Sequence, residues 1–240
     1  FASAASAQDI AVPGPVYNSS HSADVISKLS ASGKFDSVTG ISVRTSTPTA
    51  ASLAAYDAVF VFSDAGFHSP SLMGNVLADY IEGDPMDPSV KKGRVVVATF
   101  SFFGSGAPLG LQGRYMTDYS PVTGSSQGAV NGATLTEVVS GDALLENVSS
   151  FSAGTDTRYN ANISLRPGAT TVARWSSNSV PLIIRREVGS VRNVALNFYP
   201  VSSDVDTKFW NSATDGTTIM TNALEYVLAS CGNGSVEIGE

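Results

Sequence analysis

The hydrophobic residues of this chain fall into short unbroken runs, and one of these runs organises the first half. Residues 95–100 read Val-Val-Val-Ala-Thr-Phe without polar alternation, which is typical of a strand buried on both faces in a helix-covered parallel sheet. Small polar residues follow at Ser101 and from Gly104 to Gly106. Because ligands and nucleophiles of open α/β sheets gather at the carboxyl ends of central strands, we expect a site in this turn first.

The segments before this run alternate between apolar strands and helices with one apolar face. The pattern predicts strands at 9–12, 38–43 and 57–62, a helix at 22–32, a short helical turn before Tyr56, and a helix that Ser69 caps, with Pro70 at its first position. Strand, helix, strand, strand, helix, strand in this order predicts a right-handed parallel α/β sheet.

The second half has a looser pattern, and its strands are predicted to pair differently. We expect short strands and loops over 104–168 with a helix near 142–147, then strands at 171–175, 181–185 and 193–198, and a closing helix capped by Thr214 or Asp215. The strands at 181–185 and 193–198 read as a hairpin. The predicted fold class is therefore α/β and flavodoxin-like, a mostly parallel sheet with helices on both faces and an antiparallel extension in the second half.

Composition narrows the domain count and the partners. The 240 residues are 42% hydrophobic, which is enough for one large α/β domain, assigned to 8–230. The net charge of -7 argues against nucleic acid as a partner, since phosphate binding needs clustered Lys and Arg. No apolar run reaches the ~18 residues needed to span a bilayer, so no membrane insertion is expected. Only 15% of residues are charged, which favours a secreted, extracellular or cell-surface protein.

The remaining markers of compartment and cofactor are sparse. Residues 1–7 read as an inter-domain linker or as the remnant of a secretory signal. Cys231 is the single cysteine, and His21 and His68 are the two histidines, so a Cys/His zinc site cannot be assembled and no cofactor is predicted. Asn-x-Ser/Thr sequons, which permit glycosylation without requiring it, stand at Asn18, Asn147, Asn162 and Asn233.

The order of elements resembles the class I glutamine amidotransferase-like superfamily, including its trehalose-utilisation-protein-like branch. The resemblance is carried by 57–82, 93–103, 181–200 and the closing helix. It implies a nucleophilic Cys in a G-x-C-x-G turn after the central strand and a His-Pro-Glu at the end of a late strand. Here the turn reads Ala-Thr-Phe-Ser-Phe and the late strand ends Phe-Tyr-Pro-Val. The proline matches but nucleophile, base and orienting acid do not, so we expect no glutaminase or cysteine-peptidase activity.

The sequence from Cys231 to Glu240, Cys-Gly-Asn-Gly-Ser-Val-Glu-Ile-Gly-Glu, resembles the opening of the Cys-rich repeat of myxobacterial surface proteins. The resemblance implies an extracellular parent chain, a truncated repeat at 231–240, and a disulfide between Cys231 and a cysteine beyond Glu240. The alternative is a free cysteine at the end of a helix, followed by a Gly-rich tail.

Two interpretations are open for the residues near the central turn. Ser101 can replace the nucleophilic Cys, with His68 as base and Asp64 as acid, because all three follow strands that end at one edge. Alternatively, Ser101 is an ordinary small turn residue and Asp64 caps backbone amides. Asp64 together with Asp118 would also suit a cation. The resemblance places Tyr199 where a catalytic relative holds its histidine, and therefore close to Ser101.

Two further sets of residues are candidates for ligand binding. Asp204, Asp206 and Asp215 suggest calcium, yet the 12-residue loop with its closing Glu is absent, which favours turn formation. Aromatic rings that could stack on sugars, or simply pack, are Tyr115, Tyr119, Tyr159, Trp175 and Trp210.

The leading hypothesis is a non-catalytic structural or adhesive domain of a large extracellular or cell-surface protein, such as a filament or appendage component. The alternatives are an extracellular hydrolase that uses Ser101, His68 and Asp64, and a carbohydrate-binding module. The expected partners are neighbouring copies or domains of the same protein, with Phe1 as an anchor, or glycans.

Overall fold

The computed structural model describes residues 8–83, 86, 92–103 and 108–229. The linker at 1–7 with Phe1, the repeat at 231–240 with Cys231 and Asn233, and Gly104–Gly106 lie outside the described residues. The strands are β1 (Asp9–Gly14), β2 (Ser37–Ser42), β3 (Ala58–Val61), β4 (Arg94–Ala98), β5 (Val122–Gly124), β6 (Gln127–Val130), β7 (Leu135–Glu137), β8 (Thr157–Asn160), β9 (Ile163–Leu165), β10 (Ala169–Trp175), β11 (Pro181–Val188) and β12 (Val191–Leu196). The helices are α1 (Ser19–Ala31), α2 (Ala50–Leu53), α3 (Pro70–Glu82) and α4 (Gly216–Leu228), with a π-helix η1 (Tyr115–Tyr119) and a 3₁₀ helix η2 (Ala143–Leu145).

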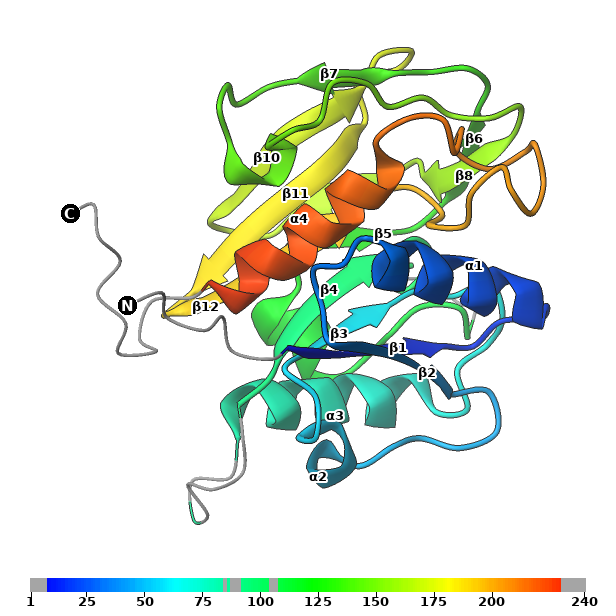
Figure 1. Cartoon of the computed structure of the whole chain (residues 1–240). Coiled ribbons are helices and arrows are strands. Elements are labelled where there is room, and N and C mark those ends of the chain that lie inside the picture. Colours follow the sequence, from blue (N-terminus) through cyan, green and yellow to red (C-terminus); the bar gives the residue numbers. More distant parts are fainter. Residues whose placement is uncertain (1–7, 84–85, 87–91, 104–107, 230–240) are drawn as a thin grey trace, which may run out of the picture.

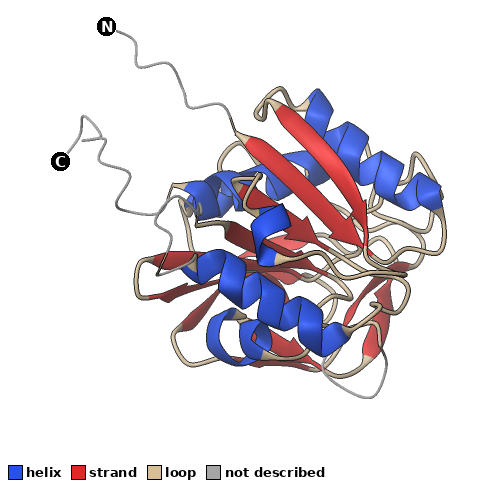
Figure 2. Ribbon diagram, turned by 90° about the horizontal axis from the view of Figure 1, so that it is seen from below, coloured by secondary structure: helices blue, strands red, loops and turns tan. Residues whose placement is uncertain are grey.

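One mixed sheet of eight strands, in the order β2-β1-β3-β4-β12-β11-β10-β7, forms the centre of the molecule. The strands from β2 to β12 in this order are parallel, and β11, β10 and β7 extend them as an antiparallel ribbon. Helices α1 and α4 lie on one face and α2 and α3 on the other (Figure 1). Figure 2 views the molecule from below, the side on which α2 and α3 lie. The predicted fold class, with its antiparallel extension and its β11–β12 hairpin, is confirmed.

The central position of β4 follows from its sequence. Because successive side chains of a strand point to opposite faces, Val96 and Ala98 pack in the core shared with α1 and α4, while Val95 and Val97 pack in the core shared with α3. All four side chains are fully buried. Apolar residues on both faces are therefore required at this strand, which lies between β3 and β12.

Element boundaries differ from the sequence predictions where side chains cap the main chain. Helix α1 begins at Ser19, three residues earlier than predicted, because the Asn18 side chain accepts a hydrogen bond from the Ser20 amide. Ser69 precedes α3 as predicted, but its side chain makes no capping hydrogen bond. The helix predicted at 142–147 is only the single turn η2. No helix in the described part of the chain is long and apolar enough to cross a membrane.

Candidate functional site

The carboxyl edge of the parallel strands brings together the turns that follow β1, β3, β4 and β12. Strand β1 has β2 on one side and β3 on the other, so successive connections run in opposite directions and make the end of β1 a topological switch point. The Pro15 carbonyl joins the β1 turn to the β3 turn by accepting the amides of Asp64 at 3.2 Å and Ala65 at 2.9 Å. Ligand sites of open α/β sheets occur at such switch points, so this edge is the candidate site.

Ser101 follows β4 at this edge but faces the protein interior. Its side chain is fully buried, and its hydroxyl lies 2.6 Å from the Ala98 carbonyl and 3.1 Å from the Val61 carbonyl. A hydroxyl carries one proton, so these two main-chain acceptors compete for it. His68 is exposed, and its amide is bound to the Val43 carbonyl. The described hydrogen bonds of Ser101 therefore include neither His68 nor Asp64.

Asp64 instead belongs to a network with a histidine from α1 and a tyrosine from the turn after β12. His21 Nδ1 lies 2.7 Å from Asp64 Oδ2, and the Tyr199 hydroxyl donates to the same oxygen at 2.9 Å. The Tyr199 hydroxyl is also 2.9 Å from His21 Nδ1. The other carboxylate oxygen accepts the Tyr17 amide at 2.8 Å. This Asp64 network ties α1 and the turns after β1, β3 and β12 to one carboxylate.

The surroundings of the Asp64 network are aromatic. The His21 ring makes edge contacts with Tyr199 and Phe209, at centroid distances of 5.7 and 5.3 Å. Burial, together with the nearby charge of Asp64, raises the pKa of the Tyr199 hydroxyl far above its usual range. Tyr199 therefore remains a donor at every physiological pH. The side-chain hydrogen bonds of His21 to described residues both use Nδ1, so no hydroxyl or thiol of a described residue is bonded to its Nε2.

Tyr199 and Ser101 occupy equivalent positions on neighbouring strands. Leu196 of β12 is paired with Ala98 of β4, and each site residue lies three positions further on. The Tyr199 ring is stacked on that of Phe100, at 6.4 Å between centroids and 26° between planes. The two residues are therefore in register at the carboxyl edge, and the equivalence of Tyr199 with the histidine of catalytic relatives stays a prediction.

Comparison with solved structures identifies the architecture. The fold is that of ThuA-like proteins and class I glutamine amidotransferases. A protein of Parabacteroides merdae described as ThuA-like is 13% identical, with a TM-score of 0.58 over 97% of this chain and 94% of its own. The protein SMU.1228c is 12% identical, with a TM-score of 0.53 over 91% and 99% of the two chains. A glutamine amidotransferase of Thermotoga maritima is 10% identical, with a TM-score of 0.52 over 92% and 99%.

These identities establish similarity of fold alone. No protein-family model and no curated protein matches the sequence. In this amidotransferase-like fold, the activity must be argued from the side chains at the carboxyl edge.

Asp118 and Asp206, two of the candidate cation ligands, accept hydrogen bonds from neighbouring protein groups. Asp118 Oδ1 accepts the Thr117 hydroxyl at 2.8 Å, and Asp206 Oδ1 accepts the Lys208 amide at 3.0 Å. Within the described ranges, no group of three or more His, Cys, Asp or Glu side chains could hold a metal ion. The bond from the Lys208 amide to Asp206, two residues earlier, is of the kind that stabilises a turn.

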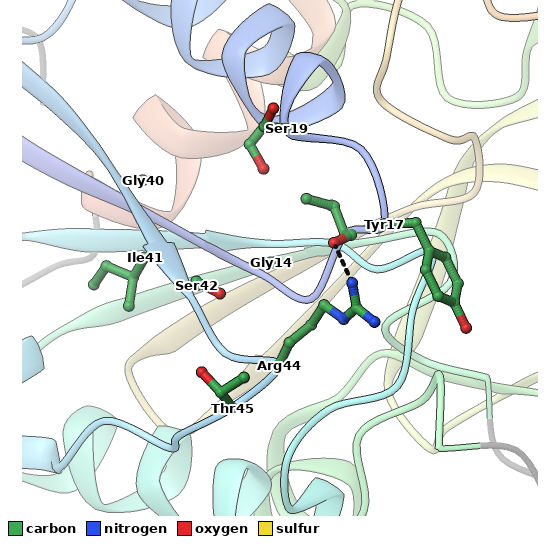
Figure 3. Close-up of a pocket in the computed structure, with 10 residues that line it drawn as sticks. Gly14, Tyr17, Ser19, Gly40, Ile41, Ser42, Arg44 and Thr45 are labelled. Carbon is green, nitrogen blue, oxygen red and sulfur yellow. Dashed lines mark hydrogen bonds between the residues drawn. The ribbon is translucent and has the colours of Figure 1, made fainter.

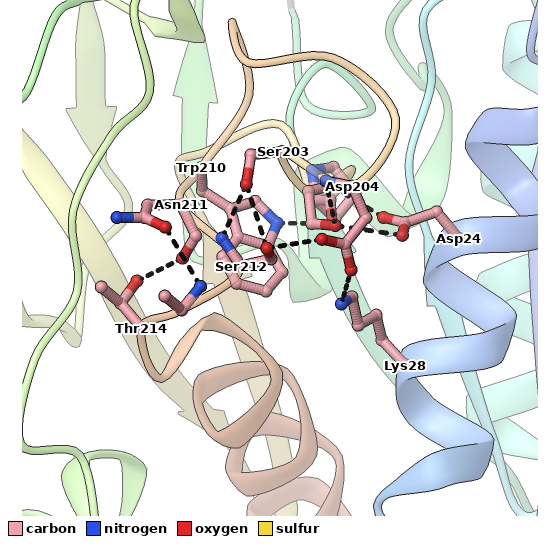
Figure 4. A network of polar contacts seen from close by, with 11 residues as sticks. Asp24, Lys28, Ser203, Asp204, Trp210, Asn211, Ser212 and Thr214 are labelled. Atoms are coloured by element: carbon pink, nitrogen blue, oxygen red, sulfur yellow. Dashed lines mark hydrogen bonds and ion pairs between the residues drawn. The ribbon is translucent and has the colours of Figure 1, made fainter.

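A polar network anchors the segment after β12 to α1 (Figure 4). Asp24 of α1 accepts both the amide and the hydroxyl of Ser202, at 2.7 and 3.0 Å. Asp204 forms an ion pair with Lys28 and accepts the Ser212 hydroxyl at 2.6 Å. The hydrogen bond from Lys28 holds the pKa of the Asp204 carboxyl below its usual range, and Ser212 adds to this effect. These contacts fix the segment that presents Tyr199 to the site.

The aromatic residues weighed as sugar platforms are mostly packed in the interior. Trp175, Trp210 and Tyr115 are fully buried and Tyr159 is 7% exposed, so their faces are unavailable to a ligand. Tyr119 is partly exposed and donates its hydroxyl to Glu82 at 2.9 Å. The exposed ring that the sequence reasoning missed is Tyr17, whose side chain is 71% exposed beside the β1 turn.

A pocket of about 640 Å³ lies next to that ring, at the carboxyl ends of β1 and β2 (Figure 3). Its lining comprises Gly14, Val16, Tyr17, Ser19, Ser22, Gly40, Ile41, Ser42, Arg44 and Thr45. Arg44 points from the segment after β2 to the β1 turn, where one of its nitrogens is 3.5 Å from the Val16 carbonyl. No sequence pattern predicts this pocket, because its walls come from separate turns.

The sequons that fall in the described part of the chain are accessible. Asn18, Asn147 and Asn162 are all exposed. The Asn18 side chain uses its oxygen to cap α1, and the Asn162 side-chain nitrogen donates to the Ser126 hydroxyl at 2.8 Å. Glycosylation at these positions remains a prediction.

Proposed function

We propose that this chain is a non-catalytic domain with an amidotransferase-like fold, which serves as a structural or adhesive unit of an extracellular or cell-surface protein. The observation that carries the proposal is the burial of Ser101 with its hydroxyl directed at two main-chain carbonyls. A serine nucleophile must reach a substrate and pass its proton to a base. Ser101 does neither in this arrangement.

The Asp64 network supports the same proposal. In an enzyme of this fold the carboxyl edge would be expected to hold an accessible nucleophile beside a base. Here Tyr199, which is 2% exposed, and His21 are bound to one carboxylate and packed against aromatic rings. The edge thus holds its turns in place, as a scaffold requires. The low charge content and the exposed sequons suit an extracellular setting.

A labelling experiment tests the proposal against the hydrolase alternative that uses Ser101, His68 and Asp64. A fluorophosphonate probe would be added to the folded wild type, to Ser101→Ala and to Ser42→Ala. The last variant is the control, because it removes a serine that is exposed. We expect no labelling above the background of the heat-denatured protein in any of them. Labelling of the wild type and of Ser42→Ala that disappears in Ser101→Ala would overturn the proposal.

A further inference from the structure

We infer that the pocket between α1 and the carboxyl ends of β1 and β2 binds an acidic saccharide, one or two sugar rings carrying a carboxylate. This inference rests on the proposed non-catalytic, adhesive function and names the ligand class for it. The pocket lies beside the β1 turn, apart from Ser101. Its volume of about 640 Å³ falls within the roughly 300–1,000 Å³ typical of small-ligand sites.

The charge of the pocket selects for an anion. Among the described residues that line the pocket, Arg44 is the only charged one, although the chain as a whole carries a net charge of -7. Among the described residues no carboxylate forms an ion pair with Arg44, whereas Arg114 and Arg185 are each paired with acidic side chains. The long contact of Arg44 with Val16 leaves most of its N–H groups free for a carboxylate.

The uncharged lining matches a sugar. Ser19 and Ser22 of α1 supply hydroxyls on one side, and Ser42 and Thr45 supply them on the other. Hydroxyls both donate and accept hydrogen bonds, as do the hydroxyls of a saccharide, so the two sets can pair in several ways. A single guanidinium also matches a singly charged uronate better than a phosphate dianion, which usually takes several cationic or main-chain donors.

Tyr17 supplies an aromatic face at the rim. Its ring is 71% exposed, and the Arg44 guanidinium lies 4.7 Å from the ring centroid on one face. This stacking holds the guanidinium in place before a ligand arrives. The Tyr17 amide is itself bound to Asp64 Oδ1 at 2.8 Å, so the Asp64 network positions the residue whose ring borders the pocket. An aromatic face of this kind stacks on the apolar side of a pyranose.

The test is a titration of the folded protein followed by NMR chemical shifts, with glucuronic acid, digalacturonic acid, glucose and inorganic phosphate as separate probes. We expect saturable shifts of pocket residues with the two uronates and at least tenfold weaker binding of glucose. Arg44→Gln should weaken uronate binding at least tenfold, and Tyr17→Ala should also weaken it. The matched control is Arg174→Gln. Arg174 lies outside the pocket, and its guanidinium likewise donates to a main-chain carbonyl, that of Ser179, at 2.7 Å.

Several results would overturn the inference. These are no saturable shift with either uronate, equal binding by Arg44→Gln and the wild type, equal binding of glucose, or phosphate binding that matches the uronates. Far-ultraviolet circular dichroism would verify that each variant is folded. A negative titration alongside absent fluorophosphonate labelling would remove the saccharide and leave the non-catalytic proposal standing, so the two failures are distinguishable.

Discussion

Replacing Asp64 by asparagine tests whether the Asp64 network holds the carboxyl edge together. The carboxylate accepts three groups, the Tyr17 amide at 2.8 Å, His21 at 2.7 Å and the Tyr199 hydroxyl at 2.9 Å. An asparagine side chain keeps one oxygen, which can remain on the Tyr17 amide. Its NH₂ group would then face two groups that now donate to Oδ2, so Asp64→Asn loses both of these hydrogen bonds.

The size of the effect follows from these two lost bonds. Hydrogen bonds to charged groups contribute about 1.5–3 kcal/mol each, and the Asp64 side chain is 17% exposed, which lets water replace part of the loss. We therefore expect Asp64→Asn to lower the free energy of unfolding by about 2–3 kcal/mol. For a domain of this size each kcal/mol corresponds to roughly 2–4 °C, so the melting temperature should fall by about 4–12 °C.

Urea denaturation at pH 7, followed by tryptophan fluorescence, measures this loss. Asp156→Asn is the matched control, because Asp156 pairs with Arg158 at the surface and its loss should cost under about 1 kcal/mol. Combining Asp64→Asn with Tyr199→Phe should cost less than the sum of the single variants, since both remove the same bond. A loss for Asp64→Asn no larger than that of the control, or strict additivity in the double variant, would refute the reasoning.

Two further predictions concern a close contact and a titration. A Cβ at Gly74 would lie 1.6 Å from a main-chain oxygen, whereas one at Gly40 would meet only the side-chain tip of Ile26, at 2.7 Å. Gly74→Ala should therefore lower the free energy of unfolding by about 2 kcal/mol or more and Gly40→Ala by under about 1 kcal/mol, and equal urea midpoints for the two variants would contradict this. Burial raises the pKa of Asp215, but hydrogen bonds from residues 149–150 outweigh it and hold the pKa below its ordinary value. Its contribution to stability is thus complete above the unfolded pKa of about 4 and is lost as the pH falls through the folded pKa. In urea denaturation, Asp215→Asn should lower the free energy of unfolding more at pH 7 than at pH 3. An equal loss of unfolding free energy at both pH values would show that the carboxylate charge contributes nothing.

The sequence predicts most of the parallel half of the fold, because local patterns decide it. Residues 95–98 have no polar side and so require a layer on each face, which the structure supplies. Over 104–168 the described residues form two small two-stranded sheets and the edge strand β7, whose partners lie far away in the chain. Short strands with distant partners show no clear hydrophobic periodicity along the sequence. For this reason the sequence predicts only mixed short strands and loops over 104–168.

The candidate site shows the same limit. The edge could be predicted, since Asp64 and Ser101 each follow a buried strand. Which histidine reaches Asp64 could not, because His68 is close in sequence while His21 is brought to Asp64 by the start of α1. Because Asn18 caps α1, the helix begins at Ser19 and His21 lies in its first turn. This earlier start of the helix places His21, and not His68, beside Asp64.

The insertion of β12 between β4 and β11 has a consequence for how the chain folds during synthesis. Val95 pairs with Asn193, about a hundred residues further along. Until that later segment leaves the ribosome, one edge of β4 has unpaired main-chain groups flanked by valines, which is the kind of edge that recruits other strands. The first hundred residues therefore cannot complete their own sheet, and we expect stable folding to begin only after the hairpin of β11 and β12 has been made.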